Sequence, residues 1–251
     1  MKHRLSVIMV TLNAQELLHR SLASTSVIAD EIIVVDAGST DSTLHILKLL
    51  KIIPIKVRTN HLGRNKAKAL SLATGDLVLS LDSDEILSRG LIKEILKIKN
   101  SKTVCSGYII PFRNYFLSKR IKHGGENYAM IRLARRKYVS IKQVSVHESL
   151  VLRSKNVGKL SSPIIHHSYR NLVQVYKKFT TYALNEARER FENGEKSSLK
   201  KIVLYPVHMF WARFIKDKGY KDGILRIPLD LGFAYMELVT YCALAYKNIV
   251  L

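Results

Sequence analysis

The chain has 251 residues, 41 of them Lys or Arg and 20 Asp or Glu, so its formal net charge at pH 7 is +21. Hydrophobic residues make up 47% of the chain, whereas Gly (12) and Pro (5) are sparse. This composition excludes collagen-like, mucin-like and intrinsically disordered chains. The two cysteines, Cys105 and Cys242, offer neither a disulfide framework nor a cysteine-based zinc site, and we expect both thiols to be buried.

The positive charge lies mainly in the second part of the chain. Residues 101–251 hold 27 basic and 10 acidic residues, whereas residues 1–100 hold 14 and 10. A field of this sign attracts polyanions such as nucleic acid, anionic lipid headgroups or phosphorylated glycans. Composition alone does not choose among them, and a basic surface can also serve solubility only.

No targeting segment or membrane span is expected. The apolar run that begins at Leu5 ends at Thr11, which is short for the core of a signal peptide. No stretch reaches the roughly 18–20 uncharged apolar residues that a membrane span needs. We therefore expect residues 202–211 and the C-terminal apolar segment to form core or interfacial helices.

The predicted elements of the first hundred residues alternate between strands and helices. Apolar runs that end in polar residues, as buried parallel strands do, predict strands over 5–12, 31–36, 53–58 and 76–81. Between and after them, helices are predicted over 16–24, 42–50, 63–73 and 90–98. This alternation favours an α/β fold with a mostly parallel sheet and helices on both faces.

The pattern becomes less regular after residue 100. Strands are predicted over 105–112, 129–133 and 149–153, and helices over 172–193, 199–216 and 224–247. We therefore predict two domains: a catalytic domain over residues 1–168, and a C-terminal helical region over residues 169–251 that contacts a membrane or an acceptor.

Polar side chains gather where the predicted parallel strands end. In open parallel sheets, ligands bind at the carboxyl ends of the strands. Acidic groups collected at one edge repel one another unless a cation or hydrogen-bond donors compensate them. The residues concerned are Thr11, Asn13, Glu16, Asp36, Asp82, Asp84 and Glu85.

The Asp82-Ser83-Asp84 segment is the sharpest of these signals. In an extended segment, residues two apart point the same way, so both carboxylates can bind one hard divalent ion such as Mn²⁺ or Mg²⁺. Water and substrate phosphates would fill the other positions. Alternatively, Ser83 or Asp84 caps the following helix. The place of the segment after a buried strand, downstream of the two other polar strand ends, favours the metal interpretation.

Two common nucleotide motifs do not occur. No Gly-x-Gly-x-x-Gly follows the first strand and no P-loop is present, which counts against a dinucleotide cofactor and against a P-loop ATPase. Asp36 can instead accept a hydrogen bond from a ribose hydroxyl or a base imide. Asp41 is expected to cap the next helix.

Five short motifs between residues 10 and 85 resemble the family 2 glycosyltransferases, which have a GT-A fold. They comprise residues 10–13 with Glu16, 31–41, 64–65 with Ala69, 73–76, and 81–85. The rest of the chain is similar to one branch, the lipopolysaccharide core glycosyltransferases of the β-glucosyltransferase type. This similarity lies in residues 113–116, 124–125, 132–133, 146–148, 163–166 and 219–223.

The resemblance implies a nucleotide-sugar donor, with a UDP-sugar as first choice, a divalent cation (Mn or Mg) and inversion at the anomeric carbon. It implies that Asp82 lies near the ribose and the metal, and that Asp84 binds the metal bridging the diphosphate. Arg64 is a candidate phosphate contact, although exposed helix cations are common. The resemblance places the nucleoside against Thr11, Asn13, Glu16 and Asp36.

Inversion by a single displacement needs a general base for the acceptor hydroxyl. Glu148 is our candidate and Glu85 is the reserve. His147 and His166 are candidates for completing the metal shell or orienting the base. Simple packing is the alternative for both histidines.

The function predicted is transfer of a sugar to a lipopolysaccharide-core or other lipid-linked glycan. A protein or peptide acceptor is the alternative, because residues 124–128, which we expect to face the acceptor, depart from the family pattern. Basic residues between 113 and 137, Arg132 among them, are expected around the acceptor. A nucleic-acid-binding module is a remote alternative that lacks helix-turn-helix, RNP-type and zinc-finger signatures, so no nucleic-acid partner is expected.

The expected location is cytoplasmic and peripheral, at the inner face of the cytoplasmic membrane. Cations close to an anionic leaflet each contribute about 1 kcal/mol of binding free energy, so an anionic membrane surface is an expected partner. The aromatic residues Tyr205, Phe210, Trp211 and Phe214 are candidates for this interface. Alternatively, they pack the helical region onto the catalytic domain.

Overall fold

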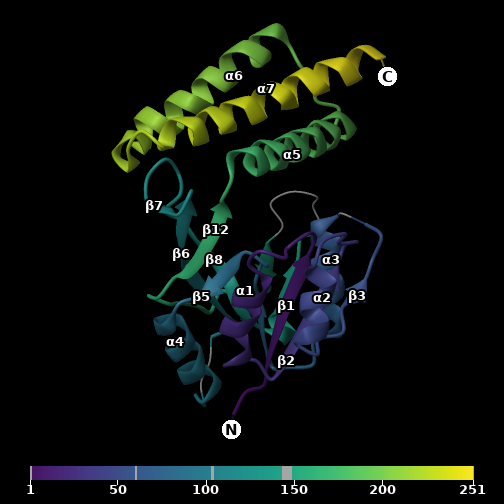
Figure 1. Ribbon diagram of the computed structural model, residues 1–251, viewed down its shortest axis with the longest axis vertical. Coiled ribbons are helices and arrows are strands. Elements are labelled where there is room, and N and C mark those ends of the chain that lie inside the picture. Colours follow the sequence, from purple (N-terminus) through teal and green to yellow (C-terminus); the bar gives the residue numbers. More distant parts are fainter. Residues whose placement is uncertain (1, 60, 103–104, 143–148, 251) are drawn as a thin grey trace. The chain divides into compact units, whose positions relative to one another are not determined.

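The computed structural model describes residues 2–59, 61–102, 105–142 and 149–250, which form a mixed α/β protein (Figure 1). The chain divides into two compact units. The first comprises Met1–Phe112 and Tyr128–His166, and the second Arg113–Asn127 and His167–Leu251. The functional division at residues 168 and 169 stays a prediction.

Four parallel strands form one side of the main sheet in the first unit. Their order is β3 (Ile55–Lys56), β2 (Glu31–Asp36), β1 (Leu5–Thr11) and β4 (Leu77–Ser80). All four were expected from their apolar runs. The third is shorter than expected and begins after Pro54, whose nitrogen has no hydrogen to donate to a ladder.

The sheet continues with antiparallel and mixed strands. β8 (Ala129–Arg135) pairs with β4, and β6 (Gly107–Phe116) pairs with β8. Next in order are β12 (Ile164–Tyr169) and β5 (Glu85–Leu87). The short strands are β7 (Lys119–Ile121) and β11 (Val157–Lys159), which pair with β6, and a separate pair, β9 (Val139–Ile141) with β10 (Leu150–Leu152).

Helices cover both faces of the parallel strands (Figure 1). Alternate residues of β1 explain why, since Val7 packs into one core and Ile8 into the other. The first core includes residues of α1 (Leu18–Ser26), α2 (Thr43–Leu49) and α4 (Arg89–Lys99), and the second includes residues of α3 (Leu62–Leu72). A strand buried on both faces has to be apolar throughout, as the sequence pattern indicated.

The second unit is mainly helical. Its helices are α5 (Leu172–Glu192), α6 (Leu199–Trp211) and α7 (Arg226–Val250), and a π-helical segment, Ala212–Lys216, continues α6. All three helices were expected. An aromatic core holds α5 and α7 together, with the Phe179 and Phe233 ring centroids 4.7 Å apart.

α7 departs from two expectations. By length and composition it could cross a membrane, although 33% of its most apolar window is buried and a core helix passes the same test. It also carries Cys242, which is exposed rather than buried. The Cys242 side chain lies on a face of α7 that is open to solvent among the described residues.

Four charged residues form a buried cluster in the second unit, the second-unit ion cluster: Glu126, Arg213, Arg226 and Asp230. Arg226 and Asp230 are fully buried, with Nη2 2.8 Å from Oδ1. Arg213 pairs with Glu126 and lies 3.3 Å from Asp230. The expectation that Glu126 faces an acceptor is therefore wrong, because only 5% of this residue is exposed.

The same cluster explains one glycine of the predicted acceptor segment. Gly124 has a φ of +63° and its carbonyl accepts a hydrogen bond of 2.8 Å from Arg226 Nη2. A Cβ at this position would lie 2.2 Å from that nitrogen. Position 124 therefore requires a glycine, because Arg226 of the same unit occupies the space that a side chain would need.

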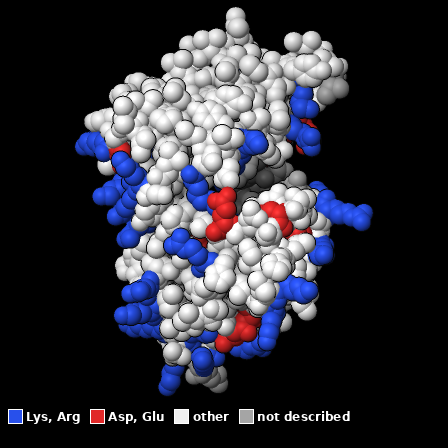
Figure 2. Space-filling view, viewed as in Figure 1, with Lys and Arg blue, Asp and Glu red and all other residues white. Residues whose placement is uncertain are grey.

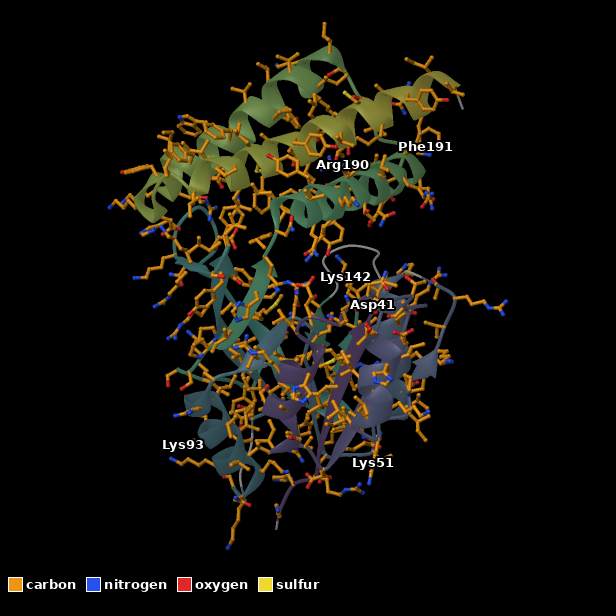
Figure 3. All side chains as sticks on the ribbon, viewed as in Figure 1. Asp41, Lys51, Lys93, Lys142, Arg190 and Phe191 are labelled. Carbon is orange, nitrogen blue, oxygen red and sulfur yellow. The ribbon has the colours of Figure 1, made fainter. Side chains whose placement is uncertain are left out.

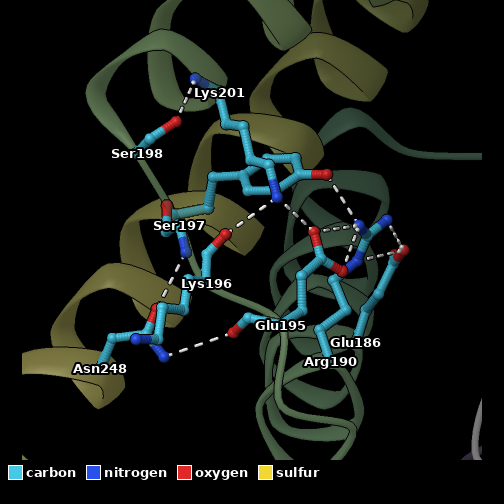
Figure 4. Close-up of polar contacts among 9 residues, drawn as sticks. Glu186, Arg190, Glu195, Lys196, Ser197, Ser198, Lys201 and Asn248 are labelled. Atoms are coloured by element: carbon cyan, nitrogen blue, oxygen red, sulfur yellow. Dashed lines mark hydrogen bonds and ion pairs between the residues drawn. The ribbon is translucent and has the colours of Figure 1, made fainter.

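A second set of polar contacts joins the three helices (Figure 4). Arg190 on α5 donates to the Tyr241 hydroxyl on α7 (2.7 Å) and to Glu186 Oε1 (2.6 Å). Lys201 on α6 donates to Oε1 of Glu195 (2.8 Å), and Glu195 lies in the segment that follows α5. Arg190 thus lies where α5 faces α7 (Figure 3).

Candidate active site

Thr11 and Asp36 lie side by side because β1 and β2 are parallel and in register there. Asp36 is buried, and its Oδ2 accepts from Thr11 Oγ1 (2.8 Å) and Ser39 Oγ (2.6 Å). Its Oδ1 accepts from the backbone N–H groups of Gly38 (3.1 Å) and Ser39 (2.9 Å). Burial raises the pKa of Asp36, but these hydrogen bonds outweigh burial and hold the pKa below its ordinary value. Asp36 is therefore a charged residue that fixes the turn after β2 through its bonds to Gly38 and Ser39.

The loops after β1 and β2 hold each other. Asn13, with a φ of +50°, accepts from the Thr40 N–H (2.8 Å) and donates its own N–H to Ser39 Oγ (2.9 Å). Asp41 Oδ1 accepts from the N–H of Thr43 (2.9 Å), the first residue of α2, but the N-cap residue of this helix is Ser42 and not Asp41 as expected. Asn13 is exposed at this edge of the sheet, and so is Glu16.

Four charged residues form the first-unit ion cluster: Lys66, Asp82, Glu85 and Arg132. Lys66 Nζ lies 2.6 Å from Asp82 Oδ1. Arg132 Nη2 lies 3.0 Å from Asp82 Oδ2 and 2.7 Å from Glu85 Oε1. Glu85 Oε2 also accepts from the Asp82 N–H (2.9 Å). Two cations thus supply the compensation that the gathered carboxylates require.

The two carboxylates of this cluster differ in pKa. Burial raises the pKa of Asp82, but Lys66 and Arg132 outweigh burial and hold it well below its ordinary value. For Glu85, burial together with the neighbouring Asp82 outweighs Arg132 and raises the pKa to about 7. Asp82 therefore stays charged at neutral pH, whereas Glu85 keeps its proton to a higher pH than an ordinary glutamate does.

The chain turns between Asp82 and Asp84. The Glu85 N–H donates to the Asp82 carbonyl (3.0 Å), and Asp84 Oδ2 lies 3.6 Å from His166 Nε2. The expected extended segment with both carboxylates on one side is therefore wrong. The capping alternative is also wrong, because the Ser88 side chain caps α4.

Asp84 and His166 offer one carboxylate and one imidazole to a metal ion. Within the described ranges, no group of three or more His, Cys, Asp or Glu residues is placed to hold one. Two protein ligands nevertheless fit a hard divalent ion that keeps water and takes substrate phosphates as further ligands. Asp82 fits this role less well, since both of its oxygens are paired with cations.

The sequence analysis missed Lys66 and did not predict that Arg132 pairs with the carboxylates of this site. On α3 the named candidate Arg64 is exposed, whereas Lys66 is buried. Lys66 shares its helix face with the buried Ala69, and that spacing was an available signal. Arg132 was expected around the acceptor, and the structure directs its guanidinium to Asp82 and Glu85.

An aromatic group adjoins these charges. The Phe112 and Tyr128 rings stack with their centroids 4.9 Å apart, and His166 meets Phe112 edge-on at 5.9 Å. The Arg132 guanidinium lies 5.3 Å from the Phe112 centroid. The two remaining candidates, His147 and Glu148, lie outside the described residues.

Comparison with known proteins shows the family and the fold of the chain. The model of the family described as "Glycosyl transferase family 2" matches residues 6–157. An uncharacterized glycosyltransferase of Rickettsia typhi is 29% identical over 260 residues, which cover 94% of this chain and 85% of that protein. One of Rickettsia prowazekii is 29% identical over 258 residues, with the same coverage.

A solved structure shares the fold. Residues 1–349 of TarS from S. aureus, in complex with UDP-GlcNAc, match 98% of this chain and 92% of that one with a TM-score of 0.53 and 14% sequence identity. This match confirms the GT-A-like fold, and the family match covers the strand ends where the polar residues lie. The chain belongs to glycosyl transferase family 2 and is a glycosyltransferase.

Proposed function

We propose that this glycosyltransferase moves a sugar from a UDP-sugar to a lipid-linked glycan, such as a lipopolysaccharide core, with inversion. The observation that carries the proposal is the pair Asp84 and His166, 3.6 Å apart and partly exposed beside a buried ion cluster. UDP is the first choice because the S. aureus neighbour was solved with UDP-GlcNAc. The enzyme would work at the cytoplasmic membrane, where such acceptors are held.

The loops after β1 and β2 would hold the nucleoside. Asp36 has four internal hydrogen bonds, so its contribution is the shape of the turn at Gly38 and Ser39. Asn13 and Glu16 are exposed at the same edge and are the side chains proposed to contact the nucleoside. Arg64, exposed in the first turn of α3, is the proposed phosphate contact.

Asp84 and His166 would hold a divalent cation, Mn²⁺ or Mg²⁺. Such an ion supplies electrostatic stabilisation of the charge that develops on the departing nucleoside diphosphate. The role of this chain is to present the two ligands in a fixed place. Lys66 and Arg132 do so by pinning Asp82 at the start of the turn that carries Asp84.

Glu148 remains the proposed base. A base has to reach the acceptor hydroxyl, within about 2.6–3.2 Å or through one water. Glu85 is fully buried and both of its oxygens are bonded, to Arg132 and to the Asp82 N–H. This geometry favours Glu148 over Glu85.

The test is donor turnover by the purified protein with Mn²⁺ or Mg²⁺. A panel of nucleotide sugars is first ranked by thermal shift, because a ligand that binds only the folded state raises the melting temperature. We expect Asp84→Asn to lower turnover of the best donor by about 10²–10³-fold, as when one transition-state stabilising group is lost. Asp217→Asn, an exposed aspartate in the second unit, is the matched control and should be unchanged.

The acceptor class is tested separately. A labelled donor is incubated with the protein and a cell-envelope extract, and the product is partitioned between lipid and protein fractions. Label in the lipid fraction supports the proposal, and label in protein supports the alternative acceptor. Wild-type turnover by Asp84→Asn, or a panel in which no nucleotide sugar is bound, would contradict the site assignment.

A further inference from the structure

α6 and α7 leave large apolar side chains exposed. On α6, the exposed side chains of Val203, Val207 and Trp211 recur at intervals of four residues, which puts them on one helix face. Trp211 is 49% exposed and Val207 is 64% exposed. Val203 and Leu204 belong to the same face, and Leu199 and Tyr205 are further exposed apolar residues of this helix.

α7 has a comparable face. Four of its exposed apolar residues follow helical spacing, namely Leu231, Leu238, Tyr246 and Ile249, and Val250 is exposed at its end. None of the described exposed residues of α7 is charged. We call the four residues of the α6 face and these four spaced residues of α7 the α6–α7 apolar face. In Figure 2 the surface over the two helices, at the top of the view, is almost entirely white.

Exposed apolar surface of this extent marks a site of contact with a partner or a membrane. Its composition favours a membrane, since Trp and Tyr are the residues enriched where a bilayer meets water. Trp211 and Tyr246 provide one such ring on each helix. Tyr220, which is 48% exposed, adds a third ring in the connection between them.

Cations border the apolar face. Lys216, Lys218 and Lys221 are exposed in the connection between α6 and α7, and Lys200 is exposed in the first turn of α6. Among these connecting residues the exposed acidic side chain is Asp217. A positive rim around an apolar surface complements an anionic lipid headgroup layer.

The opposite side of α7 is bound to protein. Arg226 and Asp230 are buried in the second-unit ion cluster, and the Tyr241 hydroxyl accepts from Arg190 on α5. Asn248, near the end of α7, accepts from the Ser197 N–H (2.9 Å). A helix with one charged, packed side and one apolar side lies along a membrane surface and does not cross it.

We infer that the α6–α7 apolar face docks onto the surface of an anionic bilayer, with both helices lying parallel to the membrane plane. This inference rests on the proposed function. A lipid-linked acceptor is held in a membrane, so an enzyme docked on the bilayer can reach it. A second copy of the chain is the competing occupant. A two-fold interface would pair identical faces, each with its own lysine rim, and like charges would oppose it.

The first experiment is sedimentation of the full chain with vesicles, without nucleotide sugar or metal. Vesicles of phosphatidylglycerol with phosphatidylcholine are compared with phosphatidylcholine alone. We expect binding to the anionic vesicles, and a reduction of at least tenfold in the triple variant Leu204→Ser, Val207→Ser and Leu238→Ser. Leu49→Ser with Ile53→Ser is the control, because both residues are exposed and apolar in the first unit.

Trp211 is the sole tryptophan of the chain, so its fluorescence reports on this face alone. We expect a blue shift on addition of anionic vesicles, and a loss of that shift in the triple variant. Changing Lys216, Lys218 and Lys221 to Ala should weaken binding to anionic vesicles. Circular dichroism and a melting curve establish that each variant is folded.

Donor turnover in vesicle-free solution separates the two proposals. The triple variant should keep wild-type turnover there, whereas Asp84→Asn should bind vesicles like wild type. Equal vesicle binding by wild type and the triple variant would overturn the docking inference and leave the proposed function standing. A dimer in light scattering that the triple variant dissociates, with no vesicle binding, would assign the face to a second copy instead.

Discussion

Each unit of this protein contains a cluster of two acidic and two basic residues. The first-unit ion cluster joins Lys66 and Arg132 to Asp82 and Glu85, and the second-unit ion cluster joins Arg213 and Arg226 to Glu126 and Asp230. Both are largely buried and both draw their members from distant parts of the chain. By charge and burial alone, the two clusters are alike.

Their surroundings differ. The acidic residues of the first cluster follow the carboxyl end of β4, and between them lies the partly exposed Asp84 next to His166. The second is sealed by the Gly124 backbone and the Phe233 ring, which the Arg213 guanidinium covers at 3.5 Å. A buried ion cluster therefore does not mark an active site by itself, and an accessible group fixed by the cluster is the better indicator.

The largest expected effect on stability is in the second cluster. Arg226→Met leaves Asp230 buried with a single cationic partner, and breaking a buried pair costs about 3–5 kcal/mol of unfolding free energy. Urea unfolding measures this loss. Arg188→Met, an exposed arginine of α5, is the control and should change the free energy by less than about 0.5 kcal/mol.

Donor turnover per folded molecule should be unchanged in Arg226→Met. A loss of turnover in the folded protein would break the distinction between the clusters, since it would give the second cluster a role in the reaction.

Glu85 gives the first cluster a pH dependence. Its pKa is raised to about 7, so the folded state holds a proton that the unfolded state releases near pH 4.5. The resulting stability is present below pH 4.5 and is lost as pH rises through 7. From pH 5 to pH 8, the unfolding free energy of wild type should fall by about 2–3 kcal/mol more than that of Glu85→Gln.

Urea unfolding at the two pH values measures this difference. Asp82 and Asp36 do not interfere in this range, because their pKa values are lowered and their contributions are lost only in more acidic solution. Parallel pH profiles for wild type and Glu85→Gln would contradict the assignment of a raised pKa to Glu85.

Lys66→Met tests the first-unit ion cluster through the activity of the enzyme. With Lys66 gone, Asp82 keeps only Arg132 and the turn that carries Asp84 loses one anchor. A misplacement of about 1 Å lowers turnover by about 10²-fold. Donor turnover against Mn²⁺ concentration is the measurement, and we expect kcat to fall.

The control for this variant lies on the same helix. Lys68→Met removes an exposed lysine of α3 and should retain wild-type kcat. Equal kcat in the two variants would mean that Lys66 has no part in positioning the turn.

The smallest effect is expected where an ion pair is partly exposed. Glu186 and Arg190 on α5 are both more than a quarter exposed, so Glu186→Gln should cost less than about 1 kcal/mol of unfolding free energy. Thermal unfolding at low and high salt measures it. A cost comparable to that of Arg226→Met would show that burial is not what separates these pairs.

Much of the fold was predictable because β1 and β2 are continuous apolar runs that end in polar residues. α5, α6 and α7 were predictable from their length and composition. The short strands β5 and β7 were not, since three residues contain less than two periods of any pattern. The pairing of β12 with β5, which brings His166 beside Glu85 in register, joins segments about eighty residues apart in sequence.

The family resemblance and the GT-A fold were predicted and confirmed, whereas the lipopolysaccharide branch, the acceptor and the location stay predictions. For the site, Asp82 and Asp84 were predicted to lie on one side of an extended segment, with Asp82 near the ribose and the metal and Asp84 on the metal. The turn between them gives the two carboxylates different neighbours. Asp82 pairs with Lys66 of α3 and Arg132 of β8, and the sequence around Asp82 does not reveal these partners. Glu126 and Arg132 were both assigned to an acceptor surface, and both are buried in ion pairs.

The order of strands and helices, the polar strand ends and the family followed from the sequence alone, because these depend on local periodicity and on motifs of adjacent residues. Which carboxylate stays charged, which one holds a proton, and which glutamate or arginine is buried were decided only by tertiary structure. Burial and charge partners are set by residues far away in sequence, and they change a pKa or an ion pair without leaving a local pattern.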